Sequence, residues 1–251
     1  MLNSFMEPII EIKGLKKSFG THQILKNLSL HLNKDENLVI LGRSGEGKSV
    51  TIKCVVGLLE QDEGSVKIFG EEVKDMNGDQ LKAMRSITGF LFQSAALYDS
   101  MTVRENLAFP LIRVLKIKKE EEIDQRIHLV LESVGLVDAI DKMPSDLSGG
   151  MRKRVGLART LIVNPKIMLY DEPTTGLDPI TSRDISELIM TIKKQYQTAS
   201  IIITHDMECA RITGDRIVII HDGQCIAEGT YDDLNHSEDE FIKSFFKFHQ
   251  S

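Results

Sequence analysis

The sequence predicts an α/β fold with two additions to its core. Short apolar runs separated by helical stretches indicate buried parallel strands. The start of the chain instead alternates apolar and polar residues, and a long middle stretch carries a helical pattern. These three observations predict a core sheet covered by helices, an N-terminal antiparallel β-subdomain and an inserted helical subdomain.

The antiparallel β-subdomain is predicted from the first part of the chain. Residues 9–20 read IIEIKGLKKSFG and residues 22–32 read HQILKNLSLHL. Alternation of this kind is typical of antiparallel strands with one buried face. We therefore expect two or more such strands before the core begins.

The core strands are predicted from four apolar runs at wide intervals. Runs of this length, rich in isoleucine and valine, favour strands that are buried on both faces. Helical stretches between them leave room for crossover connections. The four runs are Leu38–Leu41, Ile167–Tyr170, Ser200–Thr204 and Ile217–Ile220.

The helical subdomain is predicted between about residues 94 and 159, where the apolar β-runs disappear. Within it, five apolar residues recur at i, i+4, i+7, i+8 and i+11, which places them on one helix face. They are Ile123, Ile127, Val130, Leu131 and Val134. We expect one domain over residues 1–251 with this subdomain inserted in it.

Composition limits the function classes. The chain has 251 residues and a net charge of −6, which disfavours a nucleic-acid partner. Its three cysteines have no metal-type spacing and are expected to be free thiols in a reducing compartment. No signal peptide and no apolar run of about 18 residues is visible, so we expect a cytoplasmic protein that can sit on a membrane partner.

Residues 42–50, GRSGEGKSV, carry the strongest motif. Gly42, Gly47, Lys48 and Ser49 match a phosphate loop, which follows the apolar run LVIL directly, as the motif requires. Glycines turn backbone N–H groups toward phosphates, Lys48 adds a cation and Ser49 can ligate Mg²⁺. The alternative is a chance glycine-rich turn. We assign ATP binding to the whole run, which also includes Arg43, Ser44, Gly45, Glu46 and Val50.

Two acids end the apolar run at residues 167–172, IMLYDE. Asp171 is expected at the carboxyl end of a buried strand, where α/β sheets bind ligands, and can hold Mg²⁺. Glu172 could then polarise the water that attacks the γ-phosphate. The alternative is a strand followed by a solvated acidic turn.

Two further strand ends carry candidate catalytic residues. His205 ends the run IIITH and could hydrogen-bond the γ-phosphate, although a lone histidine is more often a surface or core residue. Gln93 ends the strand-like run in FLFQSAAL and can touch Mg²⁺ or the attacking water. In isolation Gln93 would mean little.

A second glycine-rich segment lies at residues 147–151, LSGGM. It would open a helix and present a second phosphate-binding surface. One ATP site has no use for two such surfaces, but two chains facing each other do. The alternative for Ser148, Gly149 and Gly150 is a simple helix cap.

In this order, these residues resemble the ATP-binding subunits of ABC transporters over nearly the whole chain. The motifs are the phosphate loop 42–49, Gln93, the signature 147–151, YDEP at 170–173, GLD at 176–178 and His205. The resemblance implies a P-loop NTPase with a RecA-like core, which binds ATP and Mg²⁺. It also implies that Phe19 stacks on adenine, with core packing as the alternative.

The same resemblance implies a head-to-tail homodimer. ATP would lie between the phosphate loop of one chain and the signature of the other, and Asp178 would communicate between the two sites. Because no membrane span is visible, an integral-membrane permease is the implied partner. The chain would then be peripheral on the cytoplasmic face of the inner membrane.

A finer resemblance is to the Mla-type ATPases, which energise phospholipid transport between bacterial membranes. It rests on Glu46 and Val50 in the loop, SAALYDSMTVRENLAFPL after Gln93, and RKRVGLAR after Met151. A periplasmic lipid-binding subunit would be a further partner. Those ATPases often carry a C-terminal extension that contacts the opposite subunit, whereas this chain stops soon after Phe248, so that contact is in doubt.

Other interpretations remain. The tail at residues 241–248, FIKSFFKF, could pack on its own domain or bind a partner. The chain could be a soluble ABC ATPase that acts as an assembly scaffold, as in iron–sulfur cluster assembly, or could serve transport of another substrate. A ribosome-associated ABC protein is disfavoured by the net charge and the single cassette, and a non-hydrolysing regulator by Glu172.

Overall fold

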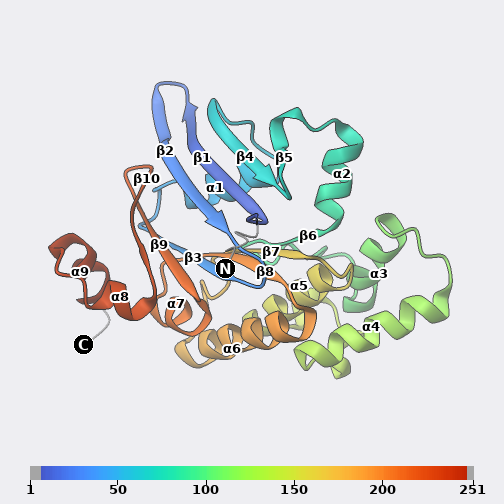
Figure 1. Cartoon of the computed structure of the whole chain (residues 1–251). Coiled ribbons are helices and arrows are strands. Elements are labelled where there is room, and N and C mark those ends of the chain that lie inside the picture. The colour runs from blue at the N-terminus through green and yellow to red at the C-terminus, as the bar shows by residue number, and fades with distance from the viewer. Residues whose placement is uncertain (1–6, 248–251) are drawn as a thin grey trace, which may run out of the picture. The chain divides into compact units, whose positions relative to one another are not determined.

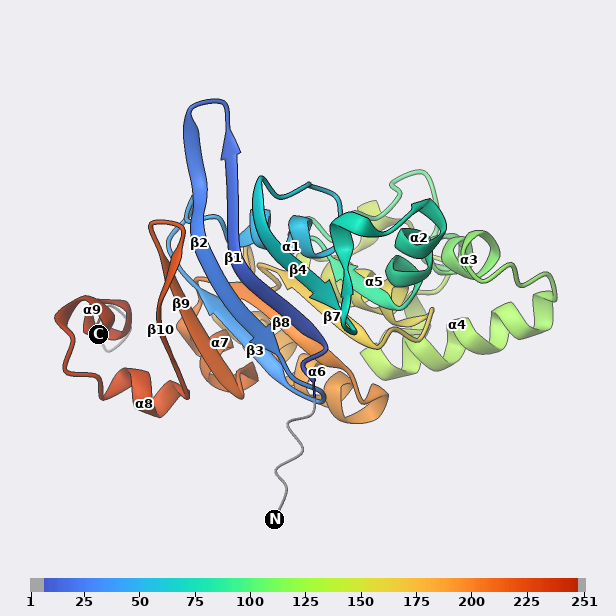
Figure 2. The ribbon, with the colours of Figure 1, turned by 45° about the horizontal axis from the view of Figure 1, so that its top comes forward.

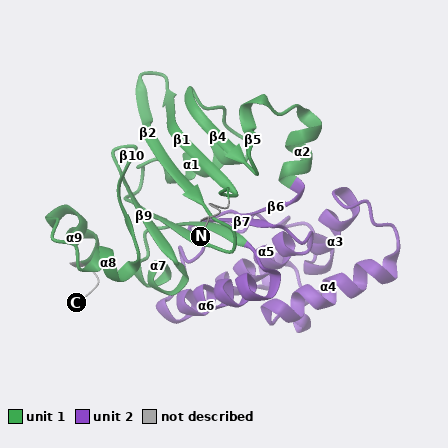
Figure 3. Ribbon diagram, viewed as in Figure 1, with its two compact units in different colours: residues 1–85, 199–251 green, residues 86–198 purple. Residues whose placement is uncertain are grey.

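The structure is a computed structural model that describes residues 7–247 (Figures 1 and 2). It divides into two compact units, coloured separately in Figure 3. Residues up to Arg85 and from Ala199 onward form the first unit, and residues Ser86–Thr198 form the second. The Phe248 end of the predicted tail lies outside the described residues.

The first unit contains a four-stranded antiparallel sheet in the order β2-β1-β4-β5. β1 and β2 run side by side as a long hairpin (Figure 2), in which Ile12 pairs with Leu30, both buried. A register shift occurs around Gly14, whose φ of +59° suits a β-bulge. The predicted antiparallel start is confirmed. The strands are β1 Ile10–Phe19, β2 His22–Leu32, β4 Glu63–Ile68 and β5 Glu71–Glu72.

The first unit also holds four core strands in the order β10-β9-β3-β8. β3 is parallel to both β8 and β9, and β10 returns antiparallel to β9. All five residues of β3 are buried, as a strand covered on both faces requires. Three of the predicted core strands are thereby confirmed. The bounds are β3 Asn37–Leu41, β8 Ala199–Thr204, β9 Arg216–His221 and β10 Gln224–Gly229.

Five α-helices and one 3₁₀ turn complete the described part of the first unit. α8 packs beside β10 and α9, and α1 contacts β2 and β4. Both cysteines on the helices are buried, and burial raises the pKa of the Cys54 thiol to about 11, so this thiol is unreactive at neutral pH. The helices are α1 Lys48–Val55, η1 Val73–Asp75, α2 Gly78–Ser86, α7 Met207–Thr213, α8 Tyr231–Asn235 and α9 Glu240–Lys247.

The second unit pairs two parallel strands with four α-helices. β7 confirms the last predicted core strand. α5 is central, because it contacts α3, α4, α6 and β6. The elements are β6 Thr88–Leu91, α3 Val103–Arg113, α4 Glu120–Val134, η2 Val137–Ala139, η3 Pro144–Asp146, α5 Gly149–Leu161, β7 Ile167–Asp171 and α6 Pro179–Tyr196.

The helical pattern of the middle stretch corresponds to α4. Its five predicted face residues, from Ile123 to Val134, are all buried. Residues 94–159 contain helices, turns and irregular segments but no strand, and the compact unit is wider because it also contains β6, β7 and α6. Among residues 7–247, no helix is both long enough and apolar enough to cross a bilayer.

Candidate active site

The loop between β3 and α1 has the backbone shape of a phosphate cradle. Gly45 and Gly47 have φ values of +89° and +90°, a region that glycine adopts without strain. A Cβ on Gly47 would also lie 2.5 Å from Leu25 Cδ2. The Gly47 carbonyl accepts the Thr51 N–H at 2.9 Å, so α1 begins directly after the loop. The first-turn N–H groups of α1 therefore point toward the loop, where an anion is favoured.

Lys48 supplies the cation of this loop. Its side chain is 7% exposed, and Nζ donates to the Gly42 carbonyl at 2.6 Å and to the Arg43 carbonyl at 3.0 Å. These bonds hold the ammonium at the loop. Ser49, in the first turn of α1, brings a hard hydroxyl oxygen of the kind that Mg²⁺ prefers.

Glu46 points away from the loop interior. Its carboxylate accepts the Asp222 N–H at 2.5 Å and contacts His221 Nδ1 at 3.0 Å. The β9–β10 turn therefore anchors the phosphate loop. Any contribution of Glu46 to nucleotide binding would come from its backbone. No motif or pattern in the sequence indicated that His221 and Asp222 would be partners of the loop.

His205 lies beside the start of the phosphate loop. Leu41 and Thr204 are register partners at the ends of β3 and β8, so Gly42 and His205 leave neighbouring strands together. Both line a cavity of about 200 Å³, with Arg43 among the other lining residues. The structure thus brings together two sequence-predicted parts of the site within the first unit.

The C-terminal helix α9 forms another wall of this cavity. Ser244 and Phe245 line it, and the Phe241 ring lies 4.5 Å from the His221 ring. Phe246 is 4% exposed and packs on Tyr231 at 5.3 Å between ring centroids. The described part of the tail therefore packs on its own unit, as the first of its two interpretations expected.

Phe19 lies at the exposed end of β1. Its side chain is 49% exposed, with Lys17 Nζ 5.8 Å from the ring centroid. This exposure excludes the core-packing alternative. The ring is accessible for stacking on a flat ligand.

In the second unit, Asp171 and Glu172 stand at the end of β7. Glu172 has φ of +52°, a left-handed conformation that costs a non-glycine residue about 1 kcal/mol or more. Its Oε2 accepts the Thr175 hydroxyl at 3.1 Å. Strain of this kind is characteristic of functional turns.

Gln93 begins a turn that is also strained. Ala95 and Ala96 have φ values of +60° and +47°. The Gln93 carbonyl accepts Lys153 Nζ at 2.5 Å, while its side chain is exposed. Lys153 is 5% exposed on α5 and also donates to the Glu172 carbonyl at 3.2 Å. Burial lowers the pKa of Lys153, and the carboxylates of Glu172 and Asp171 oppose that shift. No motif or spacing in the sequence singles out Lys153.

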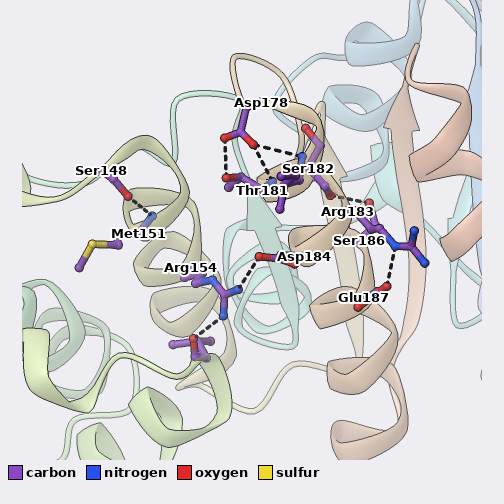
Figure 4. A network of polar contacts seen from close by, with 12 residues as sticks. Ser148, Met151, Arg154, Asp178, Thr181, Ser182, Arg183, Asp184, Ser186 and Glu187 are labelled. Carbon is purple, nitrogen blue, oxygen red and sulfur yellow. Dashed lines mark hydrogen bonds and ion pairs between the residues drawn. The ribbon is translucent and has the colours of Figure 1, made fainter.

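Ser148 caps the N-terminus of α5 (Figure 4). Its hydroxyl accepts the Met151 N–H at 3.2 Å. A Cβ on Gly150 would lie 2.5 Å from Thr181 Cγ2, so this glycine permits close packing on α6. Ser148 is therefore a helix cap. Other N–H groups of the first turn of α5 have no acceptor inside the helix, as an anion site needs.

Asp178 caps α6 in the same view (Figure 4). Its carboxylate accepts the Thr181 N–H at 3.0 Å and the Thr181 hydroxyl at 2.6 Å. These bonds hold the pKa of Asp178 below its ordinary value. The side chain is exposed at the helix start.

The expected Mg²⁺ donors are oxygen atoms of a hydroxyl, an amide and a carboxylate. Ser49 belongs to the first unit, and Gln93 and Asp171 to the second. Across residues 7–247, no group of three or more His, Cys, Asp and Glu side chains could hold a metal by itself. Mg²⁺ usually takes one or two protein ligands with phosphates and waters, and each of these oxygen donors is of the chemical kind that it binds.

Comparison with known proteins agrees with this geometry. Residues 25–175 match the family described as ABC transporter. The probable ribonucleotide transport ATP-binding protein mkl of Mycobacterium leprae is 40% identical over 236 residues, which cover 94% of this chain and 68% of the relative. The methionine import ATP-binding protein MetN of Clostridium tetani is 39% identical over 226 residues, covering 90% and 70%.

A solved structure supports the same family. A dimeric ATP-binding cassette in a post-hydrolysis state, bound to ADP and Pi, superposes with a TM-score of 0.80 at 32% identity. The match covers 88% of this chain and 98% of that one. The RecA-like α/β fold is thereby established. The chain belongs to the ABC transporter family and is an ATP-hydrolysing transporter subunit.

Proposed function

We propose that this chain is the motor of an ABC transporter in which residues 42–50 hold the triphosphate of ATP. The phosphate loop carries this proposal, because Gly45 and Gly47 take positive φ and Lys48 is held at the loop. Ser49 and Asp171 would ligate Mg²⁺ together with Gln93. When bound, Mg²⁺ would neutralise charge on the β- and γ-phosphates. Phe19 would stack on the adenine.

Glu172 is the proposed catalytic carboxylate, which orients and polarises the attacking water. His205 would hydrogen-bond the γ-phosphate, and Gln93 would position the water. Lys48→Ala should abolish hydrolysis. Glu172→Gln keeps the shape of the side chain and should retain ATP binding while nearly eliminating turnover. Wild-type turnover by Glu172→Gln would refute the role of Glu172.

Two chains are proposed to close on two ATP molecules. Ser148, Gly149 and Gly150 would offer a hydroxyl and helix N–H groups to the phosphates held by the partner chain. Asp178 would link the two sites. ATP then favours the closed dimer because it binds both surfaces only in that state. The dimeric relative bound to ADP and Pi supports this arrangement.

The turn after Gln93 is the proposed docking site for a membrane permease. Tyr98 is 44% exposed, and its ring lies 5.0 Å from the Phe109 ring. Buried Asn106 holds this turn with two hydrogen bonds, donating to the Tyr98 carbonyl at 3.1 Å and accepting the Tyr98 N–H at 2.8 Å. A charge at Leu97 or Tyr98 should uncouple hydrolysis from transport. If transport and assembly survive, the docking site lies elsewhere.

Phospholipid is the proposed cargo, moved between bacterial membranes by a complex on the cytoplasmic face of the inner membrane. The support is the Mla-like sequence of the phosphate loop, the Gln93 turn and the signature helix. Two relatives are instead named for ribonucleotide transport and methionine import. A periplasmic lipid-binding subunit is the further partner that this proposal implies.

A gentle detergent pull-down of the tagged chain tests the proposal, with mass spectrometry of proteins, lipids and small metabolites. Tyr98→Asp serves as the matched control, which should fail to capture a permease. A permease with phospholipid and a lipid-binding subunit supports the cargo. A permease that co-purifies with methionine or nucleotides would replace phospholipid as the proposed cargo. A permease without any bound cargo would remove the support for phospholipid. Soluble partners alone would overturn the transporter and favour the assembly scaffold.

A further inference from the structure

Lys153 is a buried cation for which the proposed hydrolysis has no role. It lies on α5, one turn after the signature glycines, and is 5% exposed. A buried ammonium is costly unless it is hydrogen-bonded. Its Nζ donates to two backbone carbonyls, those of Gln93 at 2.5 Å and Glu172 at 3.2 Å. All three residues belong to the second unit.

Both carbonyls belong to strained turns. Glu172 has φ of +52°, and Ala95 and Ala96 have φ of +60° and +47°. Left-handed conformations of non-glycine residues persist only where neighbouring contacts hold them. A cation that accepts no hydrogen bond but donates three can satisfy both carbonyls at once.

The rest of the α5 face supports the Gln93 turn. An added Cβ on Gly156 would lie 2.9 Å from Ala95 Cβ, which shows how closely helix and turn approach. Arg159 donates to the Ala95 carbonyl at 3.3 Å and lies over the Tyr98 ring at 5.7 Å. α5 is thus one rigid element that starts at the signature and contacts both the Gln93 turn and Glu172.

We propose that Lys153 is a positioning residue that fixes the backbone of Glu172 and Gln93 in the orientation needed for hydrolysis, and so ties both to the signature helix. The proposal rests on the catalytic role proposed for Glu172. The ammonium acts through these two backbones and need not touch ATP. A shift of the catalytic carboxylate by about 1 Å can cost about 100-fold in rate.

The test is steady-state ATPase and ATP binding for Lys153→Met and Lys153→Gln. Lys153→Met removes both bonds and leaves no buried charge. We expect kcat to fall about 10- to 100-fold, with KM and the affinity for a fluorescent ATP analogue within about threefold of native. Lys153→Gln keeps an NH₂ donor for one carbonyl and should recover part of kcat. Lys194→Met, an exposed lysine on α6 of the same unit, is the matched control.

A merely structural lysine would behave differently. It would lower Tm and the folded fraction but leave kcat per folded chain within twofold of native, and that result overturns the proposal. So does a Lys153→Gln variant that folds but is no more active than Lys153→Met. If Lys153→Met does not fold, Lys153→Gln decides alone, with reduced kcat at unchanged KM as the supporting result. Measuring Glu172→Gln in the same assay distinguishes failure of the Lys153 proposal from failure of the role proposed for Glu172. Normal turnover by Glu172→Gln would refute the role of Glu172 itself.

Discussion

Gly150→Ala separates the two roles of the signature glycine. The added Cβ would lie 2.5 Å from Thr181 Cγ2, about 1 Å closer than an ordinary carbon contact. Overpacking of this kind costs about 1–3 kcal/mol. Alanine recovers up to about 1 kcal/mol through its helix propensity. We therefore expect a net loss of about 1 kcal/mol in the free energy of unfolding.

Thr181→Ser removes the clashing methyl and keeps the hydroxyl that bonds Asp178 at 2.6 Å. In urea unfolding, the double variant Gly150→Ala/Thr181→Ser should regain the lost stability, with a coupling of about 1–3 kcal/mol. Gly78→Ala is the control, because nothing lies within 4 Å of its added Cβ. An unchanged stability of Gly150→Ala, or no coupling to Thr181, would refute the packing argument.

ATPase activity of the same double variant addresses function. If Gly150 lets the helix start approach a partner's phosphate, activity should remain at least about 10-fold below native although stability is restored. Native activity in the double variant would instead mean that Gly150 serves only packing. Ser148 and its neighbours would then be a helix cap alone.

Three further predictions concern stability and binding. Burial raises the pKa of Glu36, but hydrogen bonds from Arg216 and the Asn33 N–H together outweigh burial and leave the folded pKa lowered. The stabilisation by Glu36 is therefore present above pH 4.5 and lost as pH falls through the folded pKa. The stability gap between native and Glu36→Gln in urea unfolding should therefore shrink below pH 4.5; a constant gap contradicts this. Truncation after Glu240 should cost about 2 kcal/mol in unfolding, because it removes buried Phe246, and should leave dimerisation unchanged; lost dimerisation would favour the partner interpretation. Gly47→Ala should abolish binding of a fluorescent ATP analogue, because alanine is strained at the φ of +90° that Gly47 adopts. Native affinity in this variant would contradict the strain argument.

The sequence was most informative where a period or a motif is local. Apolar runs located β3, β7, β8 and β9, and a repeat of 3.6 residues located the buried face of α4. The sequence did not predict the short strand β5, because Glu71 and Glu72 are polar and form a strand only by pairing with β4. Local patterns cannot report a pairing that a neighbouring strand imposes.

In the candidate site, too, local features were predicted and long-range contacts were not. Glycine spacing predicted the phosphate loop, but nothing in the sequence linked Glu46 to His221, which lies 175 positions away along the chain. The burial of Lys153 could not be predicted either, because a lysine in a helix is usually exposed. Burial and long-range hydrogen bonds decide such roles, and both exist only in the folded chain.

In the proposed mechanism, ATP joins two chains through the phosphate loop of one and the signature of the other. The most direct measurement is the solution mass of Glu172→Gln by light scattering, with and without ATP and Mg²⁺. We predict a monomer without ATP, a dimer with it, and loss of that dimer when Ser148→Arg is added. A monomer in the presence of ATP, or a dimer that forms without ATP and survives Ser148→Arg, would show that ATP does not join two chains in this way.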